Sequence, residues 1–409
     1  MAITSGKQLK QRWNEILQQE TGLVTPRCRH FGECGGCSLQ QVTYARQVEL
    51  KQQVLSEIFA EVDLPEQVVV VPSPQEYEYR LRMDYAASFD PFHLPNNRLG
   101  LRRKKRFNHV IDLGECFLVP VDIFPKLRQI FDLALELEIP VYDLVSSKGW
   151  LRYFVIRQLD DQRMLSIIAK DDSFPEKMEK LAALALELGF TSVHWLANNS
   201  DGDTSTGEPV RCWGEEFLHT QIKFNDKSLL LDVGPFNFFQ NNIAGFCELM
   251  LFVTEFIDRL QDKPQSLLDL YSGVGTIGIM LAHLFRDVYA IELEQSNVEL
   301  ANHNAKLNNI ENIRSFHGDA GEFTQHFPNQ DDALAIVDPP RAGLETRGVA
   351  ELLKLRPKYL VYISCNPITQ ARDLTQLTDS YDILAMKGYD LFPQTLHLEN
   401  VCILKLSEA

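Results

Sequence analysis

Residues 266–278 read Ser-Leu-Leu-Asp-Leu-Tyr-Ser-Gly-Val-Gly-Thr-Ile-Gly, a short apolar run that ends in a turn with three glycines. The run predicts a buried strand at 266–270, and the apolar residues after the turn predict a helix at 277–285. A glycine turn between a strand and a helix is where doubly wound α/β sheets hold a cofactor. From residue 236 onward, apolar runs and helical patterns keep alternating, so we expect a doubly wound, Rossmann-like α/β domain there.

The next three predicted strands of this domain each lead into a carboxylate. These carboxylates are Glu292 after the strand at 288–291, Asp319 after the strand at 313–317, and Asp338 after the strand at 333–337. Glu292 suits ribose hydroxyls and Asp319 suits an adenine amino group. The glycine pattern alone also fits a nicotinamide or flavin dinucleotide. However, Asp338 is followed by two prolines, which dinucleotide dehydrogenases do not need and which methyltransferases use to hold a rigid loop against a base. The pattern therefore favours S-adenosylmethionine over a dinucleotide or a purely structural turn.

Another apolar run, at 359–363, ends in the polar turn Ser364-Cys365-Asn366-Pro367. In a parallel sheet this turn lies at the same edge as the glycine turn. A polar turn can stabilise a reactive thiolate, although most free cysteines pack as small apolar side chains. Glu399, just before the final apolar run at 401–406, can face the same edge, and His397 can orient a neighbour. Cys365 and Glu399 are therefore a candidate nucleophile and a candidate base.

Methylation of uracil at C5 requires such a pair. Uracil C5 is a poor nucleophile, but a thiolate that adds to C6 moves electron density onto C5, which then attacks a sulfonium methyl group. A base must next remove the C5 proton so that the cysteine is expelled. Enzymes that methylate exocyclic nitrogens usually have an aromatic residue where this chain has Arg341, and cytosine-C5 enzymes more often use Thr-Cys and Pro-Cys turns. The residues therefore favour covalent methylation of a uracil in RNA.

Five segments together resemble the RNA 5-methyluridine methyltransferase family, and the likeness runs from about residue 27 to the end of the chain. They are Phe238-Phe-Gln-Asn-Asn242, Asp269-Leu-Tyr-Ser-Gly-Val-Gly275, Asp338-Pro-Pro-Arg-Ala-Gly343, Ser364-Cys-Asn-Pro-x-Thr369 and Phe392-Pro-x-Thr-x-His-x-Glu399. The resemblance implies that Cys365 is the nucleophile and Glu399 the proton-abstracting base. It also implies a pocket for cofactor and base, lined by Gln240, Tyr271, Gly273, Gly275, Thr276, Glu292, Asp319 and Asp338. Gln394 departs from the pattern, because many relatives carry a histidine there, and this departure concerns the proton relay of the tail rather than the base.

Cysteines cluster near the N-terminus, where Cys28, Cys34 and Cys37 form a C-x5-C-x2-C pattern and the next cysteine is Cys116. Four thiolates suit an iron–sulfur cluster or a tetrahedral zinc ion. The spacing is unlike the paired C-x2-C knuckles of zinc ribbons, and it matches the [4Fe–4S] signature of several members of the family that the chain resembles. We therefore expect a [4Fe–4S] cluster that shapes an RNA-contacting loop and takes no part in electron transfer.

The chain has 56 acidic and 40 basic residues and a formal net charge of -16, which argues against a general polyanion binder. One strip is strongly basic, and it consists of Arg102, Arg103, Lys104, Lys105 and Arg106. Such a strip is either a solvated, charged edge strand or a set of phosphate contacts. We expect it to contact RNA phosphates, and we expect Phe238 to stack near an extruded base.

At 409 residues the chain is too long for one ordinary core. We expect a helical extension at 1–26, an α+β domain at 27–235 that carries the cysteines and binds RNA, and the methyltransferase domain at 236–409. No apolar run reaches the length of a membrane span, and the first residues lack the apolar stretch of a signal peptide. The sequence therefore favours a cytoplasmic protein whose cysteines are reduced, metal-bound or catalytic, and we expect a monomer.

The choice of RNA depends on the N-terminal region. Some ribosomal RNA enzymes of the family carry the cluster together with a small N-terminal RNA-binding barrel, and too few residues precede Cys28 for such a barrel. A cluster without a barrel resembles a subset that acts on large-subunit, 23S ribosomal RNA, which is the preferred substrate. A uridine in the T-loop of transfer RNA is the alternative. An inactive RNA-binding or ribosome-assembly factor is a third hypothesis, disfavoured because both Cys365 and Glu399 are present.

Overall fold

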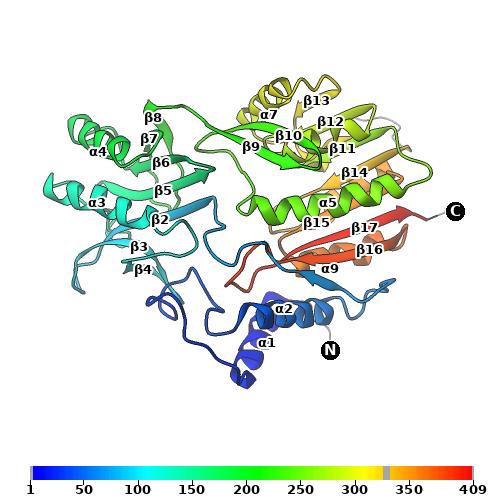
Figure 1. The fold of residues 1–409 in the computed structure, drawn as a ribbon, viewed down its shortest axis with the longest axis horizontal. Coiled ribbons are helices and arrows are strands. Elements are labelled where there is room, and N and C mark those ends of the chain that lie inside the picture. Colours follow the sequence, from blue (N-terminus) through cyan, green and yellow to red (C-terminus); the bar gives the residue numbers. More distant parts are fainter. Residues whose placement is uncertain (1–2, 326–331, 408–409) are drawn as a thin grey trace.

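The computed structural model describes residues 3–325 and 332–407. Two large β-sheets lie side by side in Figure 1, with the two N-terminal helices beneath them. Among the described helices, none combines the length and the apolar character needed to cross a membrane.

The C-terminal sheet has eight strands in the order β1-β16-β17-β15-β14-β11-β12-β13. Their bounds are β1 Val69–Val71, β11 Ser266–Leu270, β12 Asp287–Glu292, β13 Ile313–His317, β14 Ala333–Val337, β15 Tyr359–Ser364, β16 Tyr381–Tyr389 and β17 Glu399–Leu406. Strands β11 to β15 pair in parallel, whereas β17 runs antiparallel to both β15 and β16. This confirms the α/β sheet predicted for the C-terminal half, with one reversed strand.

Helices cover both faces of this sheet. They are α5 Ile243–Arg259, α6 Thr276–Leu281, α7 Gln295–Leu307, α8 Glu345–Leu355 and α9 Pro367–Leu377, with short 3-10 turns at Ala282–Leu284 and Ala320–Gln325. Successive strand residues point to opposite faces, so Leu267 packs with the core of α5, α6 and α7 while Leu268 packs with that of α8 and α9. The strands are buried on both faces, which explains their continuous apolar runs.

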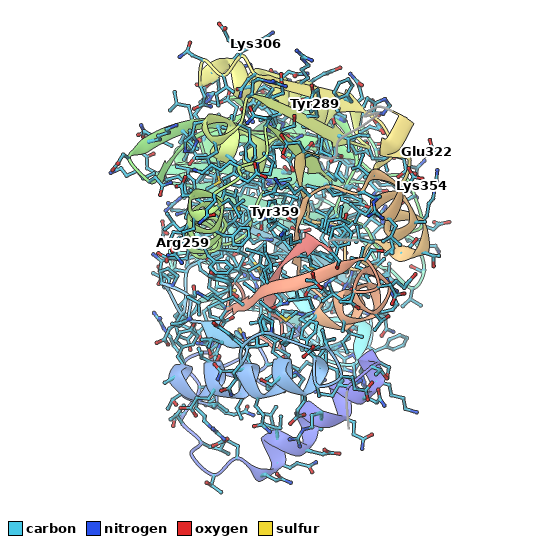
Figure 2. The ribbon with its side chains drawn as sticks, turned by 90° about the vertical axis from the view of Figure 1, so that its right-hand side faces the viewer. Arg259, Tyr289, Lys306, Glu322, Lys354 and Tyr359 are labelled. Carbon is cyan, nitrogen blue, oxygen red and sulfur yellow. The ribbon has the colours of Figure 1, made fainter. Side chains whose placement is uncertain are left out.

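The N-terminal helices complete this same body. Helices α1 (Gly6–Gln19) and α2 (Tyr44–Ile58) place Trp13, Leu50 and Val54 in one core with residues of β15 and β17. Strand β1 pairs in parallel with β16, Val69 opposite Lys387. In Figure 2, which turns the molecule by 90°, α1 and α2 form a layer at one end, and Lys306 at the end of α7 lies at the opposite end. The expected extension at 1–26 and the first part of the expected domain at 27–235 therefore pack against the methyltransferase sheet.

The central part of the chain forms a seven-stranded sheet in the order β4-β3-β2-β5-β6-β7-β8. Its elements are β2 Arg82–Phe89, β3 Asn97–Arg103, β4 Arg106–Asp112, α3 Ile123–Glu136, β5 Leu151–Leu159, β6 Gln162–Ala169, α4 Pro175–Glu187, β7 Ser192–Ala197 and β8 Glu208–Gly214. The amphipathic helices α3 and α4 bury their apolar sides in one core with β2, β5 and β6. The mixed α+β character predicted for this region is present.

A separate hairpin joins the central part to the C-terminal sheet. It consists of β9 (Leu218–Phe224) and β10 (Lys227–Val233), paired antiparallel. The Asp232 backbone N–H donates to Asn304 Oδ1 at 2.8 Å, and the Asp232 carboxylate lies 2.7 Å from His303 Nε2. The hairpin precedes the boundary expected at 235–236, yet its side chains and backbone bind α7 of the following domain.

Candidate active site

The predicted site lies where the strand order of the C-terminal sheet reverses. Strand β11 is flanked by β12 on one side and by β14 on the other, and crevices at such switch points hold ligands at the carboxyl ends of the strands. The segments that follow β11, β12, β14 and β15 carry Tyr271, the end residue Glu292, Asp338 and Cys365. The fold thus brings these four predicted site residues to one edge.

The predicted nucleophile and base meet through strand pairing. In the antiparallel ladder of β15 and β17, Ser364 lies opposite Asn400, so the next pair at this edge is Cys365 and Glu399. A parallel strand ends where its antiparallel neighbour begins, which brings residues distant in sequence together at the cofactor edge. This placement agrees with the expectation that Glu399 faces the same edge as Cys365.

The Cys365 thiol has a raised pKa. Burial is the main cause, the charge of Glu399 adds to it, and together with Asp338 they raise the pKa of Cys365 to about 11. The Arg341 guanidinium opposes this shift through its charge and a hydrogen bond to the thiol. The sequence predicted a turn that stabilises a thiolate, whereas in the free protein burial outweighs the polar turn. Cys365 is therefore a protonated thiol at neutral pH until a change at the site lowers its pKa.

Two carboxylates face each other beside this thiol. Burial raises the pKa of Asp338 to about 7, and a hydrogen bond of 3.2 Å from Gln240 Nε2 partly opposes the shift. Burial and the nearby charge of Asp338 also raise the pKa of Glu399 well above its ordinary value. Glu399 Oε1 is buried without a hydrogen-bond partner, which leaves an acceptor for a substrate.

Arg341 connects the diproline loop to the nucleophile turn and to the tail. Its carbonyl accepts a hydrogen bond of 2.9 Å from Asn366 Nδ2, and its Nη2 lies 2.7 Å from Nδ1 of His397. Desolvation and the guanidinium charge lower the pKa of His397 to about 4, so a neutral ring can accept this bond, although part of the side chain stays exposed. No catalytic role was predicted for Arg341, and its position right after the diproline is the signal that could have indicated one.

The glycine turn after β11 leaves space for a cofactor. Gly273 and Gly275 have φ values of +55° and +81°, and among the described residues other than Gly273 and its two chain neighbours no heavy atom lies within 4 Å of the position that a Cβ on Gly273 would take. The Gly273 N–H donates to Glu292 Oε2 at 3.0 Å, and Tyr271 has a φ of +67°. Glycine adopts such backbone angles without steric cost, and the open side of the turn suits a ligand.

The remaining predicted cofactor residues flank this turn. Thr276 is the buried first residue of α6, and Asp319 follows β13, where its carboxylate contacts Arg347 at 3.2 Å. Asp269 was not predicted as a site residue. It is buried near the end of β11 and accepts a hydrogen bond of 2.9 Å from the Gly278 N–H. Burial raises the pKa of Asp269 to about 7. Its place inside the Asp-Leu-Tyr-Ser-Gly segment could have identified it as a residue that fixes the turn.

Two cavities meet at this site. One of about 260 Å³ is lined by Cys365, Arg341 and His397 and by apolar residues of α1 and α2. The other, of about 580 Å³, is lined by Arg80, Arg82 and Arg102 and by Gly35, Gly36 and Ser38 of the cysteine segment, residues 28–39. Leu396 and His397 line both. The second cavity also contains Asp84, which pairs with Arg82, so a groove with three arginines and one carboxylate runs from the central domain toward the predicted nucleophile.

The four predicted metal ligands converge on one small cavity. It is lined by Cys28, Cys34, Cys37 and Cys116. Desolvation raises the pKa of Cys34 to about 12 and that of Cys37 to about 11. The Arg29 N–H donates to Glu115 Oε1 at 3.0 Å and the Gly114 N–H to His30 Nε2 at 2.9 Å, so backbone contacts hold the two cysteine segments together.

The basic strip covers the end of β3, the turn at Lys104 and Lys105 and the start of β4, and β4 is an edge strand of its sheet. Arg102 forms an ion pair with Asp203, and Lys104 is partly enclosed, with its Nζ 5.0 Å from the centre of the Phe31 ring. The remaining strip residues are Arg103, at the end of β3, and the exposed Lys105 and Arg106. Phe238, the predicted stacking residue, is 61% exposed. The strip therefore lies directly against the cysteine segment and is partly neutralised by other side chains.

Comparisons with known proteins place this geometry in a family. The model of the tRNA (uracil-5-)-methyltransferase family matches residues 205–407. An uncharacterized RNA methyltransferase from Caldanaerobacter subterraneus subsp. tengcongensis is 32% identical over 402 residues, 96% of this chain and 87% of that protein. The tRNA (uracil(54)-C(5))-methyltransferase of Pyrococcus abyssi is 32% identical over 380 residues, 92% of this chain and 85% of that enzyme.

A solved structure extends the likeness to three dimensions. The crystal structure of the Pyrococcus abyssi tRNA (uracil-54, C5)-methyltransferase in complex with S-adenosyl-L-homocysteine has a TM-score of 0.74 and 30% identity to this chain. The similarity covers 91% of this chain and 86% of that one. The fold and the cofactor edge thus define an S-adenosylmethionine-dependent methyltransferase. The chain belongs to the tRNA (uracil-5-)-methyltransferase family and is an RNA (uracil-5-)-methyltransferase.

Proposed function

We propose that the enzyme methylates C5 of a uridine in the T-loop of tRNA through a covalent bond between Cys365 and C6 of the base. Glu399 removes the C5 proton. The register of β15 and β17, which puts Cys365 next to Glu399, carries this proposal. The buried, unpartnered Oε1 of Glu399 supports it, because a buried acceptor needs a partner that the substrate can supply.

In this mechanism S-adenosylmethionine supplies the methyl group, and the protein handles the thiol and the proton. The Cys365 thiolate bonds to C6 and makes C5 nucleophilic toward the methyl group. Glu399 then accepts the C5 proton, the electrons of the C–H bond restore the C5=C6 double bond, and the C6–S bond breaks to release the thiolate. Arg341 favours the thiolate, because its charge opposes the effect of burial on the pKa of Cys365.

The named relatives favour tRNA over the ribosomal RNA that the cysteine pattern led us to expect. Enzymes from Pyrococcus abyssi and Pyrococcus horikoshii, 32% and 31% identical to this chain, are tRNA (uracil(54)-C(5))-methyltransferases. The expectation of 23S rRNA depended on a cluster without a preceding barrel, which is a pattern of the sequence alone. We therefore take the tRNA alternative as the proposal.

We also propose that Cys28, Cys34, Cys37 and Cys116 hold a [4Fe–4S] cluster. Their shared cavity and the desolvation of Cys34 and Cys37 support a common ligand for the four sulfurs. The C-x5-C-x2-C spacing of the first three cysteines differs from the paired C-x2-C knuckles of zinc ribbons, which favours a cluster over zinc.

The substrate is tested by methylation of purified tRNA and 23S rRNA that lack 5-methyluridine. Mass-spectrometric mapping should find 5-methyluridine in the tRNA T-loop, and methylation confined to 23S rRNA would overturn the choice of tRNA. Cys365→Ala should abolish turnover, whereas Cys212→Ala, the same change at an exposed cysteine of β8, should not. Unchanged turnover in Cys365→Ala would refute the covalent mechanism.

A further inference from the structure

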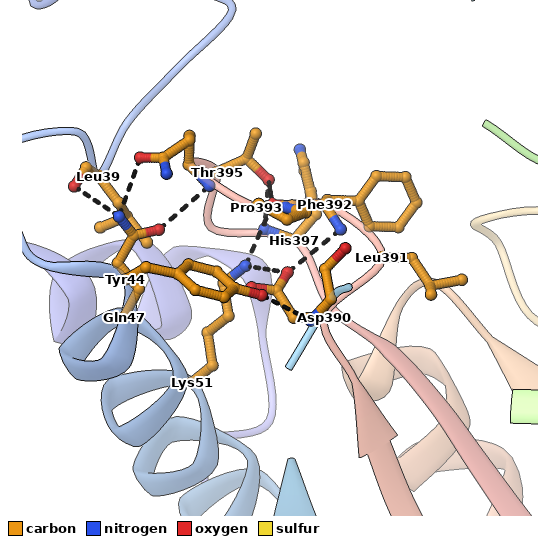
Figure 3. A network of polar contacts seen from close by, with 12 residues as sticks. Leu39, Tyr44, Gln47, Lys51, Asp390, Leu391, Phe392, Pro393, Thr395 and His397 are labelled. Carbon is orange, nitrogen blue, oxygen red and sulfur yellow. Dashed lines mark hydrogen bonds and ion pairs between the residues drawn. The ribbon is translucent and has the colours of Figure 1, made fainter. Parts of the chain in front are cut away.

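One face of α2 binds the loop that leads to Glu399. Tyr44, Gln47 and Lys51 lie three and four residues apart, so they share one side of the helix. In Figure 3 all three side chains point toward the loop between β16 and β17, where Asp390, Phe392 and His397 are drawn. This loop precedes Glu399, the first residue of β17.

An ion pair without solvent exposure fixes the start of this loop. Lys51 Nζ lies 2.6 Å from Asp390 Oδ1, and both side chains are 0% exposed. Lys51 also donates to the Phe392 carbonyl at 3.1 Å, and the Asp390 N–H donates to the Val71 carbonyl at 2.9 Å. The Tyr44 hydroxyl interacts with the same carboxylate. Desolvation offsets much of the attraction in a buried ion pair, and such a pair can contribute more to a unique geometry than to stability.

A second set of bonds fixes the middle of the loop at Gln394. Gln47 Nε2 donates to Gln394 Oε1 at 2.9 Å, and the Gln394 N–H donates to Gln47 Oε1 at 3.1 Å. The Gln394 carbonyl accepts hydrogen bonds from the backbone N–H groups of Ser38 at 2.7 Å and Leu39 at 3.1 Å. Gln394 has a φ of +66°, which is unfavourable for a residue with a side chain and persists only where surrounding contacts impose it.

The same loop carries the groups closest to the proposed chemistry. The His397 N–H donates to Thr395 Oγ1 at 3.2 Å, and the His397 ring contacts Arg341, which in turn contacts the Cys365 thiol. Gln394 meets α2 and the cysteine segment instead of Glu399. The Gln394 side chain therefore supports the loop. It does so at the position where many relatives of this chain carry a histidine.

We propose that Gln47 and Lys51 of α2 are positioning residues for proton abstraction, because they hold the 390–398 loop so that Glu399 faces the base. This inference rests on the proposed covalent mechanism. The side chains of Gln47 and Lys51 hydrogen-bond to the loop and to the Leu39 and Val42 carbonyls, so their effect falls on the step that depends on the position of Glu399. That step is the removal of the C5 proton, which follows methyl transfer.

The proposal predicts that a larger fraction of the methylated protein–RNA adduct remains unconverted to product when the contacts of α2 are removed. Gln47→Met keeps the size of the side chain and removes its bonds to Gln394 and to the Leu39 and Val42 carbonyls. Displacement of a catalytic group by about 1 Å can cost about a hundredfold in rate, so elimination should slow by about 10- to 100-fold and the methylated protein–RNA adduct should accumulate on normal RNA. Adduct formation with 5-fluorouridine RNA, which requires no proton removal, should change by less than about threefold on the same reasoning. Gln53→Met is the matched control, because Gln53 lies on the same helix and is exposed.

The experiment is a single-turnover assay with denaturing gels that separate adduct, product and free protein. The double variant Lys51→Met with Asp390→Leu removes both charges together, and it should also accumulate adduct. Equal partitioning in the wild type, Gln47→Met and Gln53→Met would overturn the positioning role, even if the variants were less stable. A wild type that forms no adduct with 5-fluorouridine RNA would instead refute the covalent mechanism, and the inference with it.

Discussion

In the free enzyme, the alkylation rate of Cys365 should still increase with pH at values where the alkylation rate of an ordinary thiol no longer changes. Burial, aided by Glu399, raises the pKa of Cys365 to about 11. Only the thiolate reacts, so the rate follows its fraction and rises about tenfold per pH unit below the pKa. Between pH 9 and pH 10 a thiol with a pKa of about 11 should gain about ninefold, whereas one with a pKa of about 8.5 gains about 1.3-fold.

The assay is a short pulse of iodoacetamide at each pH, followed by mass spectrometry of the peptide that contains Cys365. A short unstructured peptide with one internal cysteine, in the same tube, gives the curve of an exposed thiol, and circular dichroism at each pH confirms that the protein stays folded. Arg341→Met should slow alkylation at every pH below the plateau, because the guanidinium that favours the thiolate is gone. A rate that levels off by pH 9 would refute the argument that burial controls this thiol.

Three further outcomes are expected. Glu399→Gln should accumulate a denaturation-resistant adduct on normal RNA because elimination stalls, and product release at the wild-type rate would show that another group is the base. Anaerobically purified protein should be brown with about four irons per chain, and Cys34→Ser should lose the colour, whereas stoichiometric zinc without sulfide would contradict the cluster. Arg103→Gln with Lys105→Gln should weaken RNA binding and leave the affinity for S-adenosylmethionine unchanged. The slope of log binding constant against log salt concentration should flatten by roughly one to two units. An unaltered slope in a filter-binding titration would show that the strip is solvated.

The sequence predicted the strands of the C-terminal sheet well, because each is a continuous apolar run closed by a polar turn. The bounds of Ser266–Leu270, Ile313–His317 and Ala333–Val337 were predicted as the structure has them. The shared edge of Cys365 and Glu399 also followed from strand ends. The partnership of Lys51 with Asp390, 339 positions away, could not be predicted, because periodicity indicates which face of an element is buried and not which element covers it.

The pKa of the nucleophile and the pairing of charged side chains also could not be predicted from the sequence. The Ser-Cys-Asn-Pro turn indicated a stabilised thiolate, but the pKa of Cys365 depends on how deeply the turn is buried and on which carboxylates surround it. Likewise, a basic strip in the sequence says nothing of neighbours such as Asp203, which neutralises Arg102. Both features depend on distances between segments that are remote in the chain.

The contact between α2 and the catalytic loop also constrains how the chain acquires its structure during synthesis. Gln47 and Gln394 are 347 positions apart, so ribosomes that add roughly 5 to 20 residues per second make the helix roughly 20 to 70 s before its partner. During that interval the Lys51 ammonium and the part of α2 that packs with β15 and β17 have no native partner. Helix α2 can therefore complete its native packing only after the last strands have been translated, and the proposed active site is among the final parts of the nascent chain to assemble.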